Sequence, residues 1–196
     1  MRQLIRTLVG SLFLFLFSLT MIFSAGTDLF AATSAKTQAP RDTANYQSWL
    51  TEELRHQLVM LPWYTVFDNL EYKVDGSEVT LLGQVVNPTL RIDAENAVKH
   101  IEGVTKVVND IEVLPPSPMD DHIRRAEYRA IFGEPTLQRY SMGRVPSIHI
   151  VVNEGHVTLE GVVATQADKD LVNIRANTVP GIFSVTNNLR VESDRK

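Results

Sequence analysis

The stretch Val79–Val85, with the sequence VTLLGQV, recurs 78 residues later at Val157–Val163 as VTLEGVV. The same offset continues without a gap through a second signature, GVTKVVNDIEV at Gly103–Val113 and GIFSVTNNLRV at Gly181–Val191. An ungapped register over this distance predicts that one structural unit is present twice. The shared positions are turn glycines, strand valines and one asparagine, which are residue types that shape a fold.

Local patterns predict the order of elements in the first unit. Leucines at helical spacing predict a first helix that Ser48 caps and Pro62 ends. Asn87 followed by Pro88 predicts the start of a second helix, and Gly103 its end. The predicted elements are a helix at 48–61, a hairpin with strands at 70–74 and 79–85, a helix at 88–102 and a strand at 107–113.

The second unit repeats this order, with Thr165–Asp168 as a capping-box-like start for its second helix. Its connection at 133–146 is longer than the matching one in the first unit, and long connections are often functional. Residues 115–118, PPSP, predict a stiff spacer. We therefore expect an α+β protein with two tandem α-β-β-α-β modules, at 48–114 and 119–192, each a three-stranded sheet packed with two helices.

These signatures resemble the BON domain, a family named for bacterial osmotically induced and nodulation proteins. The resemblance rests on the Val-Thr-Leu-x-Gly hairpin strand and the linked Gly-Val-x-x-Val-x-Asn-x-Ile-x-Val segment, and it covers most of residues 48–192. It implies a periplasmic or secreted protein that attaches to phospholipid surfaces, acts in envelope stress or assists other envelope proteins. No catalytic motif comes with the resemblance, so it transfers no active-site residue.

Residues 1–35 have the pattern of a secretory signal peptide. Arg2 and Arg6 precede a nearly unbroken apolar run over residues 8–23, and small residues follow it. We expect cleavage and export to the periplasm or the medium. The alternative is an uncleaved anchor, because the run approaches the roughly 18 residues that cross a bilayer. Residues 36–47 are polar and lack apolar periodicity, which predicts a flexible lead-in.

Composition and charge exclude several functions. The chain has no cysteine, which rules out disulfides and thiolate chemistry, and its net charge of −4 disfavours nucleic acid. The charge is unevenly shared: residues 48–114 hold 5 basic and 11 acidic side chains, net −6, whereas residues 119–196 hold 10 of each, net 0. We expect no cofactor and no small-molecule substrate.

Histidines offer the one alternative to this expectation. His149 and His156 flank the predicted second hairpin and could approach to bind a metal, or serve a hydrolase together with Asp168. The preferred interpretation places both histidines exposed on the solvent face of the sheet, and we predict no metal site and no enzyme.

Two repeated residue types have expected structural roles. Gly83 and Gly161 lie inside strands, where glycine marks a bulge or a close approach, and we interpret them as packing against a helix. Asn109 and Asn187 are expected to tie down a sheet edge or a bulge.

The candidate binding residues lie where the two units differ. Arginines of the second unit can meet lipid phosphates or an acidic partner, although a solvated helix face is the alternative. Aromatic residues can lie at a membrane or partner surface, although closure of the core is the alternative. The candidates are Arg124, Arg125, Arg129, Arg139, Arg144, Trp63, Tyr64 and Tyr140.

Two functions remain after these exclusions. The first is an exported, non-enzymatic module pair that binds membrane phospholipid or envelope components, in osmotic or envelope stress. The second is a periplasmic adaptor or chaperone that binds proteins through Trp63, Tyr64 and the loop around Tyr140 and Met142. The acidic net charge favours the second, because it repels anionic bilayers.

Overall fold

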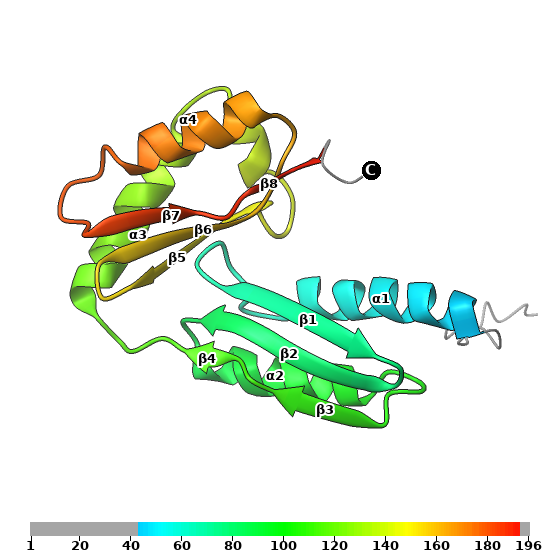
Figure 1. Ribbon diagram of the computed structural model, residues 1–196. Helices are drawn as coiled ribbons and strands as arrows, with labels where there is room; N and C mark the ends of the chain where they lie inside the picture. Colours follow the sequence, from blue (N-terminus) through cyan, green and yellow to red (C-terminus); the bar gives the residue numbers. More distant parts are fainter. Residues whose placement is uncertain (1–42, 193–196) are drawn as a thin grey trace, which may run out of the picture. The chain divides into compact units, whose positions relative to one another are not determined.

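The structure is a computed structural model that describes residues 43–192. The predicted signal peptide at 1–35, and the lead-in up to residue 42, lie outside the described residues. The described residues belong to one compact unit of the chain. Figure 1 shows them as two successive modules, each with its own sheet and its own pair of helices.

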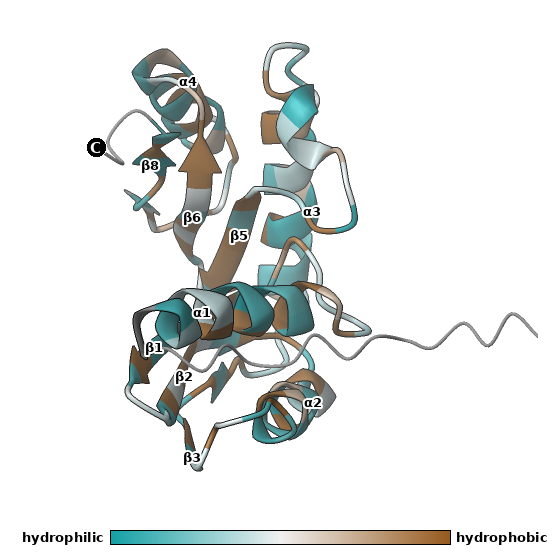
Figure 2. Cartoon of the chain, turned by 90° about the vertical axis from the view of Figure 1, so that its right-hand side faces the viewer, coloured by the Kyte–Doolittle hydropathy of each residue, from teal (hydrophilic) through white to brown (hydrophobic). Residues whose placement is uncertain are grey.

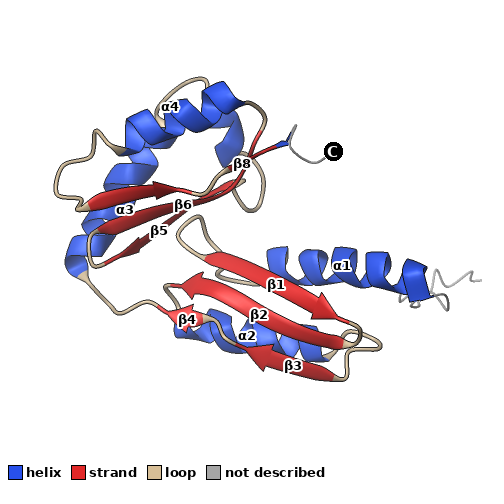
Figure 3. Cartoon of the chain, in the orientation of Figure 1, coloured by secondary structure: helices blue, strands red, loops and turns tan. Residues whose placement is uncertain are grey.

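The first module has the predicted order α-β-β-α-β (Figure 3). Its elements are α1 (Thr43–Val59), β1 (Asn69–Asp75), β2 (Glu78–Val85), α2 (Pro88–Lys99), β3 (Lys106–Asn109) and β4 (Glu112–Val113). Strand β2 lies in the centre, antiparallel to β1 and parallel to both β3 and β4. Because β3 and β4 follow one another along the same side of β2, the sheet is three strands wide.

The second module has the same topology. Its elements are α3 (Pro118–Phe132), the 3-10 helix η1 (Gln138–Ser141), β5 (Ile148–Asn153), β6 (His156–Val163), α4 (Gln166–Ala176), β7 (Ser184–Asn187) and β8 (Arg190–Val191). Strand β6 is central, antiparallel to β5 and parallel to β7 and β8. The predicted α+β class and the duplicated order are therefore confirmed.

The helix starts follow the predicted capping residues, with one exception. Asn87 accepts a hydrogen bond from the Thr89 amide, and Thr165 accepts one from the Asp168 amide. The predicted start of α1 was wrong, since the helix begins at Thr43 and the Ser48 hydroxyl donates to the Asn45 carbonyl inside it.

Contacts with distant residues explain the early start of α1. The Tyr46 hydroxyl donates to the carbonyl oxygen of Glu102, and the side-chain amide of Gln47 donates to the carbonyl oxygen of Gly76. Tertiary packing therefore makes residues 43–47 helical, although their composition predicts a flexible lead-in.

The single strand predicted at 107–113 is two short strands, because Asn109 interrupts it. Its side-chain amide donates to the Arg91 carbonyl of α2, and its side-chain oxygen accepts from the Ile111 amide. Asn187 makes the equivalent pair of bonds, to the Lys169 carbonyl and from the Leu189 amide. The expected role of the repeated asparagine is confirmed, and in both modules it ties the strand break to the preceding helix.

Gly83 and Gly161 have φ angles of +109° and +118°, in the region that favours glycine. A Cβ atom at Gly161 would lie 2.1 Å from the Ser147 carbonyl oxygen, and one at Gly83 would lie 2.1 Å from that of Asn69. Packing against a helix was therefore the wrong interpretation, because the close neighbour is the backbone of the hairpin partner strand.

Each module has its own apolar core, and Figure 2 shows the hydrophobic residues along the central strands and on one side of the helices. The first core joins both helices to β2, as Leu54, Val98 and Leu81 illustrate. The second core contains Val66, which comes from the segment between α1 and β1 of the first module. Val66 therefore brings the segment between α1 and β1 onto the second module, where the candidate site lies.

Candidate functional site

Helix α3 carries charged residues on both its buried and its exposed sides. Ser117 caps it by accepting from the Asp120 amide, and Pro118 opens its first turn. Asp120, Arg124 and Glu127 are buried with the apolar residues of the helix. The outer face exposes Arg125, Tyr128 and Arg129, which lie at the i, i+3 and i+4 spacing of one helix face.

Arg124 is part of the interior rather than of the surface. Its side chain is only 3% exposed, and its Nη2 donates to the Val152 carbonyl oxygen at 2.6 Å. Its Nη1 donates to Asp121 Oδ1, also at 2.6 Å. The guanidinium therefore joins α3 to β5 and has little left to offer a ligand.

Arg139 and Tyr140 bind Asp168, the residue at the start of α4. Arg139 Nη2 lies 2.6 Å from Asp168 Oδ2, and the Tyr140 hydroxyl donates to the same oxygen at 2.9 Å. Burial opposes the charge on Asp168, but hydrogen bonds from Thr165 and Tyr140 and the Arg139 charge outweigh it and lower the pKa of that carboxyl. This network fixes η1 against the start of α4.

Arg144 caps the carboxyl end of α1. Its Nε donates to the Val59 carbonyl oxygen at 3.0 Å, and its Nη2 donates to those of Met60 and Leu61 at 2.8 and 3.1 Å. Carbonyl groups at this end of a helix lack partners within the helix. The long connection of the second module thus holds the last turn of the first helix.

Segment 62–68, which leads from α1 to β1, packs on the second module. The Val66 carbonyl oxygen accepts from the Ile150 amide at 2.8 Å, so it occupies the outer edge of β5. The Tyr64 ring stacks on His149, with 5.4 Å between ring centroids and 15° between planes.

The prediction that His149 is exposed was wrong, because segment 62–68 covers that side of β5. His149 is only 8% exposed, and its Nδ1 has no hydrogen-bond partner among residues 43–192. Burial lowers the pKa of His149, since the charged imidazolium loses water.

Two cavities lie where segment 62–68 meets α3. The larger, of about 270 Å³, has aromatic, polar and charged walls, formed by Trp63, Thr65, Phe67, Asp68, Val86, Asn87, Asp121, Arg124 and Arg125. The smaller, of about 230 Å³, is lined by Val66, Phe67, Arg125, Tyr128 and Arg129. Phe67 and Arg125 line both cavities, so the two adjoin along the outer face of α3.

Four of the eight candidate residues line these cavities, and three of them, Trp63, Arg125 and Arg129, are exposed. The guanidinium groups of Arg125 and Arg129 make no ion pair or hydrogen bond among residues 43–192. Trp63 is 70% exposed and has a φ of +69°, which is unusual for a residue with a side chain. We call Trp63, Phe67, Arg125, Tyr128 and Arg129 the α3 patch. It combines free guanidinium groups with aromatic surface.

Sequence reasoning missed Tyr128 and did not offer Phe67 as a candidate binding residue. The helical spacing of Tyr128 between Arg125 and Arg129 was the available signal for a shared face. No local signal was available for Phe67, because its place depends on the packing of segment 62–68 against α3. The ring centroids of Phe67 and Tyr128 lie 6.4 Å apart.

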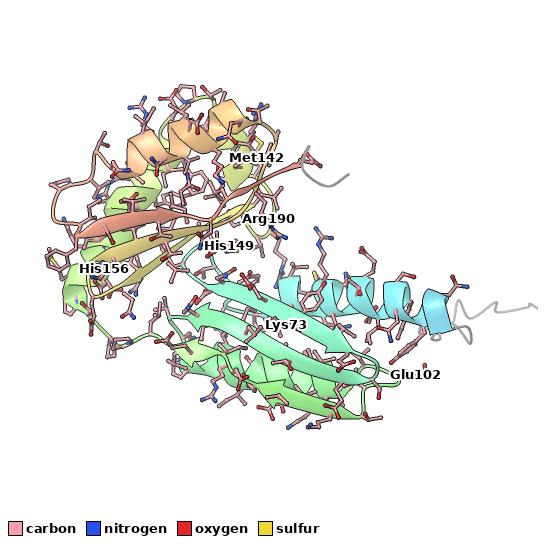
Figure 4. All side chains as sticks on the ribbon, viewed as in Figure 1. Lys73, Glu102, Met142, His149, His156 and Arg190 are labelled. Atoms are coloured by element: carbon pink, nitrogen blue, oxygen red, sulfur yellow. The ribbon has the colours of Figure 1, made fainter. Side chains whose placement is uncertain are left out.

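The hydrolase alternative gains no support from the geometry. Figure 4 shows His149 and His156 at different ends of the second hairpin, and the register pairs them with Glu160 and Asn153. His156 contacts Ser184, and Asp168 is held by Arg139, Tyr140 and Thr165. Within the part of the chain that the structure describes, no three His, Asp or Glu residues are grouped to hold a metal ion.

No helix between residues 43 and 192 is long and apolar enough to span a membrane.

Comparison with known proteins supports the duplicated architecture. The model of the BON domain family matches residues 47–115 and 137–193. The second match begins after α3, so the helix that carries most of the α3 patch lies outside the matched stretches.

A curated relative is similar over part of its length. The osmotically-inducible protein Y of Escherichia coli (strain K12) is 29% identical over 135 residues, which are 63% of this chain and 62% of that protein. The match thus spans less than two thirds of the relative.

Solved structures give only a weak likeness. The C-terminal domain of CdsD, the structural protein of the type III secretion system of Chlamydia trachomatis, aligns at 11% identity over 72% of this chain and 96% of that chain, with a TM-score of 0.26. A score this low bears on neither fold nor function. The two matched stretches and the two α-β-β-α-β modules show that the chain belongs to the BON domain family.

Proposed function

We propose that the protein is exported, acts in the bacterial envelope under osmotic stress, and binds anionic phospholipid surfaces through the α3 patch. The observation that carries the proposal is the pair of unpartnered guanidinium groups, Arg125 and Arg129, beside aromatic cavities and the exposed Trp63. The osmotic context is supported by the relative named above and by the family.

Each part of the α3 patch suits a lipid–water boundary. Guanidinium groups bind phosphate through paired, charge-assisted hydrogen bonds. Tryptophan and tyrosine favour the interface, because one end of the ring system is apolar and the other is polar. The net charge of −4 opposes approach to an anionic bilayer, so the attraction has to come from the guanidinium groups of Arg125 and Arg129. Because salt screens that attraction, we expect binding that weakens as salt rises.

Flotation with vesicles tests this proposal. Protein is mixed with vesicles of phosphatidylglycerol and phosphatidylcholine at low salt, and the floated fraction is measured. The double variant Arg125→Ala/Arg129→Ala is expected to lose most binding, because it removes the free guanidinium groups. The control Arg55→Ala/Lys73→Ala removes the same charge from exposed positions of the first module and is expected to retain binding.

The outcomes separate patch binding from general charge attraction. Equal loss in both double variants, or no flotation of the native protein at low salt, contradicts the proposal. Trp63 supplies an independent signal: in a Trp49→Phe background, its fluorescence is expected to shift to the blue on vesicles as the ring leaves water.

A protein-binding adaptor or chaperone is the second candidate. It is favoured by two apolar side chains that remain largely in water, Phe183 and Met142, which are 77% and 71% exposed. Tyr64 and Tyr140 are not available for this role, because one stacks on His149 and the other binds Asp168. Suppression of client aggregation that is lost in Phe183→Ser/Met142→Ser, with vesicle binding absent, would favour this function over lipid binding.

A further inference from the structure

The larger cavity contains four charged side chains, and two of them, Asp68 and Arg124, are held within the protein, although the Nε of Arg124 is buried without a hydrogen-bond partner among residues 43–192. Asp68 Oδ1 accepts from the Val86 amide, and its Oδ2 accepts from the amide and the hydroxyl of Thr65. Arg124 is held by Asp121 and the Val152 carbonyl. These two charges therefore shape the cavity but do not reach out to a ligand.

The other two charges retain unused capacity. The guanidinium group of Arg125 has no polar partner among residues 43–192. Asp121 is 49% exposed, and only its Oδ1 is occupied, by Arg124. Asp121 and Arg125 are four residues apart on α3, a spacing that places Cβ atoms about 5–6 Å from one another. Nevertheless, no ion pair joins them, so a free donor and a free acceptor lie side by side on one wall.

A plain anion does not suit this wall. It would meet Arg125 but would also lie near the carboxylates of Asp121 and Asp68, and like charges at such distances repel. A cation alone meets the converse problem with Arg124 and Arg125. A ligand that carries both charges a short distance apart satisfies both free groups at once.

The aromatic residues favour an ammonium group as the cationic part. Trp63 and Phe67 line the same cavity, and an ammonium group near an aromatic face is attracted by the ring. A primary ammonium can in addition donate a hydrogen bond to Asp121 Oδ2, which a quaternary ammonium cannot.

We propose that the larger cavity binds a zwitterionic ethanolamine phosphate head group, with its phosphate on Arg125 and its ammonium between Asp121 and Trp63. The adjoining smaller cavity, which shares Phe67 and Arg125, receives the apolar part that follows the phosphate. This inference rests on the proposed phospholipid binding and adds a head-group preference to it. The same chemistry occurs in a bilayer lipid and in a free head group, so the experiment has one arm for each.

The bilayer arm compares two vesicle compositions at an equal fraction of phosphatidylglycerol. One contains phosphatidylethanolamine and the other phosphatidylcholine as the remaining lipid. We expect several-fold tighter binding to the ethanolamine vesicles. Asp121→Asn is expected to abolish this advantage while leaving binding to the choline vesicles, whereas Asp110→Asn, at an exposed position of the first module, is expected to keep it.

The soluble arm titrates glycerophosphoethanolamine into the native protein and follows the indole N–H of Trp63 by NMR. Saturable shifts at Trp63 that Arg125→Ala removes are expected. Trp63→Asn provides a second variant for the vesicle arm, since asparagine tolerates the positive φ at this position. It keeps the test informative if Asp121→Asn does not fold, because Asp121 also pairs with the buried Arg124.

The outcomes distinguish the two proposals. Equal binding to both vesicle types, together with no shift from the soluble head group, overturns the head-group inference and leaves anionic lipid binding in place. Saturable binding of the soluble head group without vesicle flotation overturns the proposed function and retains the cavity as a site for the free compound. An ethanolamine advantage that persists in both Asp121→Asn and Trp63→Asn overturns the assignment to this cavity.

Discussion

Glu127 shows at the residue scale how a charge on the inner face of α3 affects stability. Its side chain is fully buried, and neither carboxylate oxygen has a hydrogen-bond partner among residues 43–192. Desolvation raises the pKa of Glu127 from 4.5 to about 8. The folded module therefore binds this proton more tightly than the unfolded chain does.

The stability of the second module is expected to depend on pH through Glu127. Because the folded pKa is raised, the folded state loses stability relative to the unfolded state as pH rises from about 4.5 to about 8. Glu127→Gln removes this loss, because the amide does not titrate. We expect the free energy of unfolding of the variant, relative to the native protein, to be higher above pH 8 than at pH 4 by on the order of a few kcal/mol. Urea unfolding across this range measures it, and a difference between native and variant that does not change with pH contradicts it.

His149 is expected to make stability depend on pH in the opposite direction. Burial lowers the pKa of His149 below its ordinary value of 6.5, so protonation favours the unfolded state and stability falls as pH drops below that value. His149→Phe keeps a ring to stack on Tyr64 and is expected to remove this acid-side loss. His122→Gln, at an exposed position of α3, is expected to leave it unchanged. Unfolding midpoints between pH 7.5 and pH 5 test the pair.

At the scale of elements, much of the fold follows from sequence. Asn87 and Thr165 each cap a helix through their own side chains, and alternating apolar residues define β2 and β6. These signals act over a few residues, so they can be read without the fold. The start of α1 could not be read, because it depends on contacts of Tyr46 with residues that are distant in sequence.

The hairpin glycines give a prediction for elements. Gly161→Ala places a Cβ against the Ser147 carbonyl oxygen at a φ of +118°, so the strand has to shift. We expect a loss of at least about 2 kcal/mol in the free energy of unfolding. Gly76→Ala is the control: it also has a positive φ, but no heavy atom lies within 4 Å, and we expect about 1 kcal/mol. Equal losses in chemical denaturation would contradict the steric explanation.

At the scale of the whole molecule, the two modules are joined by more than the spacer at 115–118. Val66 belongs to the core of the second module, and Arg144 donates to three carbonyl groups at the end of α1. The spacer itself is shorter than expected, since Ser117 caps α3 and Pro118 is its first residue. The long connection, one feature that the repeats do not share, thus contributes a contact between them.

Arg144 gives a prediction at this scale. Arg144→Ala leaves the Val59, Met60 and Leu61 carbonyl groups to water, and we expect a loss of about 1–2 kcal/mol. Because the bonds link two modules, we expect the native protein to unfold in one cooperative transition in calorimetry and the transition of the variant to broaden or split. Arg144→Lys is expected to recover only part of the effect, since an ammonium group lacks the planar fork. A uniform shift of one sharp transition contradicts the linking role.

The positions of the candidate side chains also depend partly on helix geometry and partly on contacts with residues that are distant in sequence. Arg125 and Arg129 remain free, as expected of residues on the outer face of α3. Arg124 differs from Arg125 by one position along the helix, which is about 100° of rotation, and this is enough to bury it against β5. Arg139, Tyr140 and Tyr64 are used in contacts with Asp168 and His149, which no local pattern indicates.

The sequence by itself determined the duplicated modules, their order of helices and strands, the capping residues Asn87 and Thr165, and the family. Those features arise from periodicity, side-chain capping and backbone preference, which act between residues close together in the chain. Only the tertiary structure decided that segment 62–68 covers β5, that His149 is buried and that Trp63, Phe67 and Arg125 share a cavity wall. The physical reason is that burial and free hydrogen-bonding capacity depend on which distant segment covers each face.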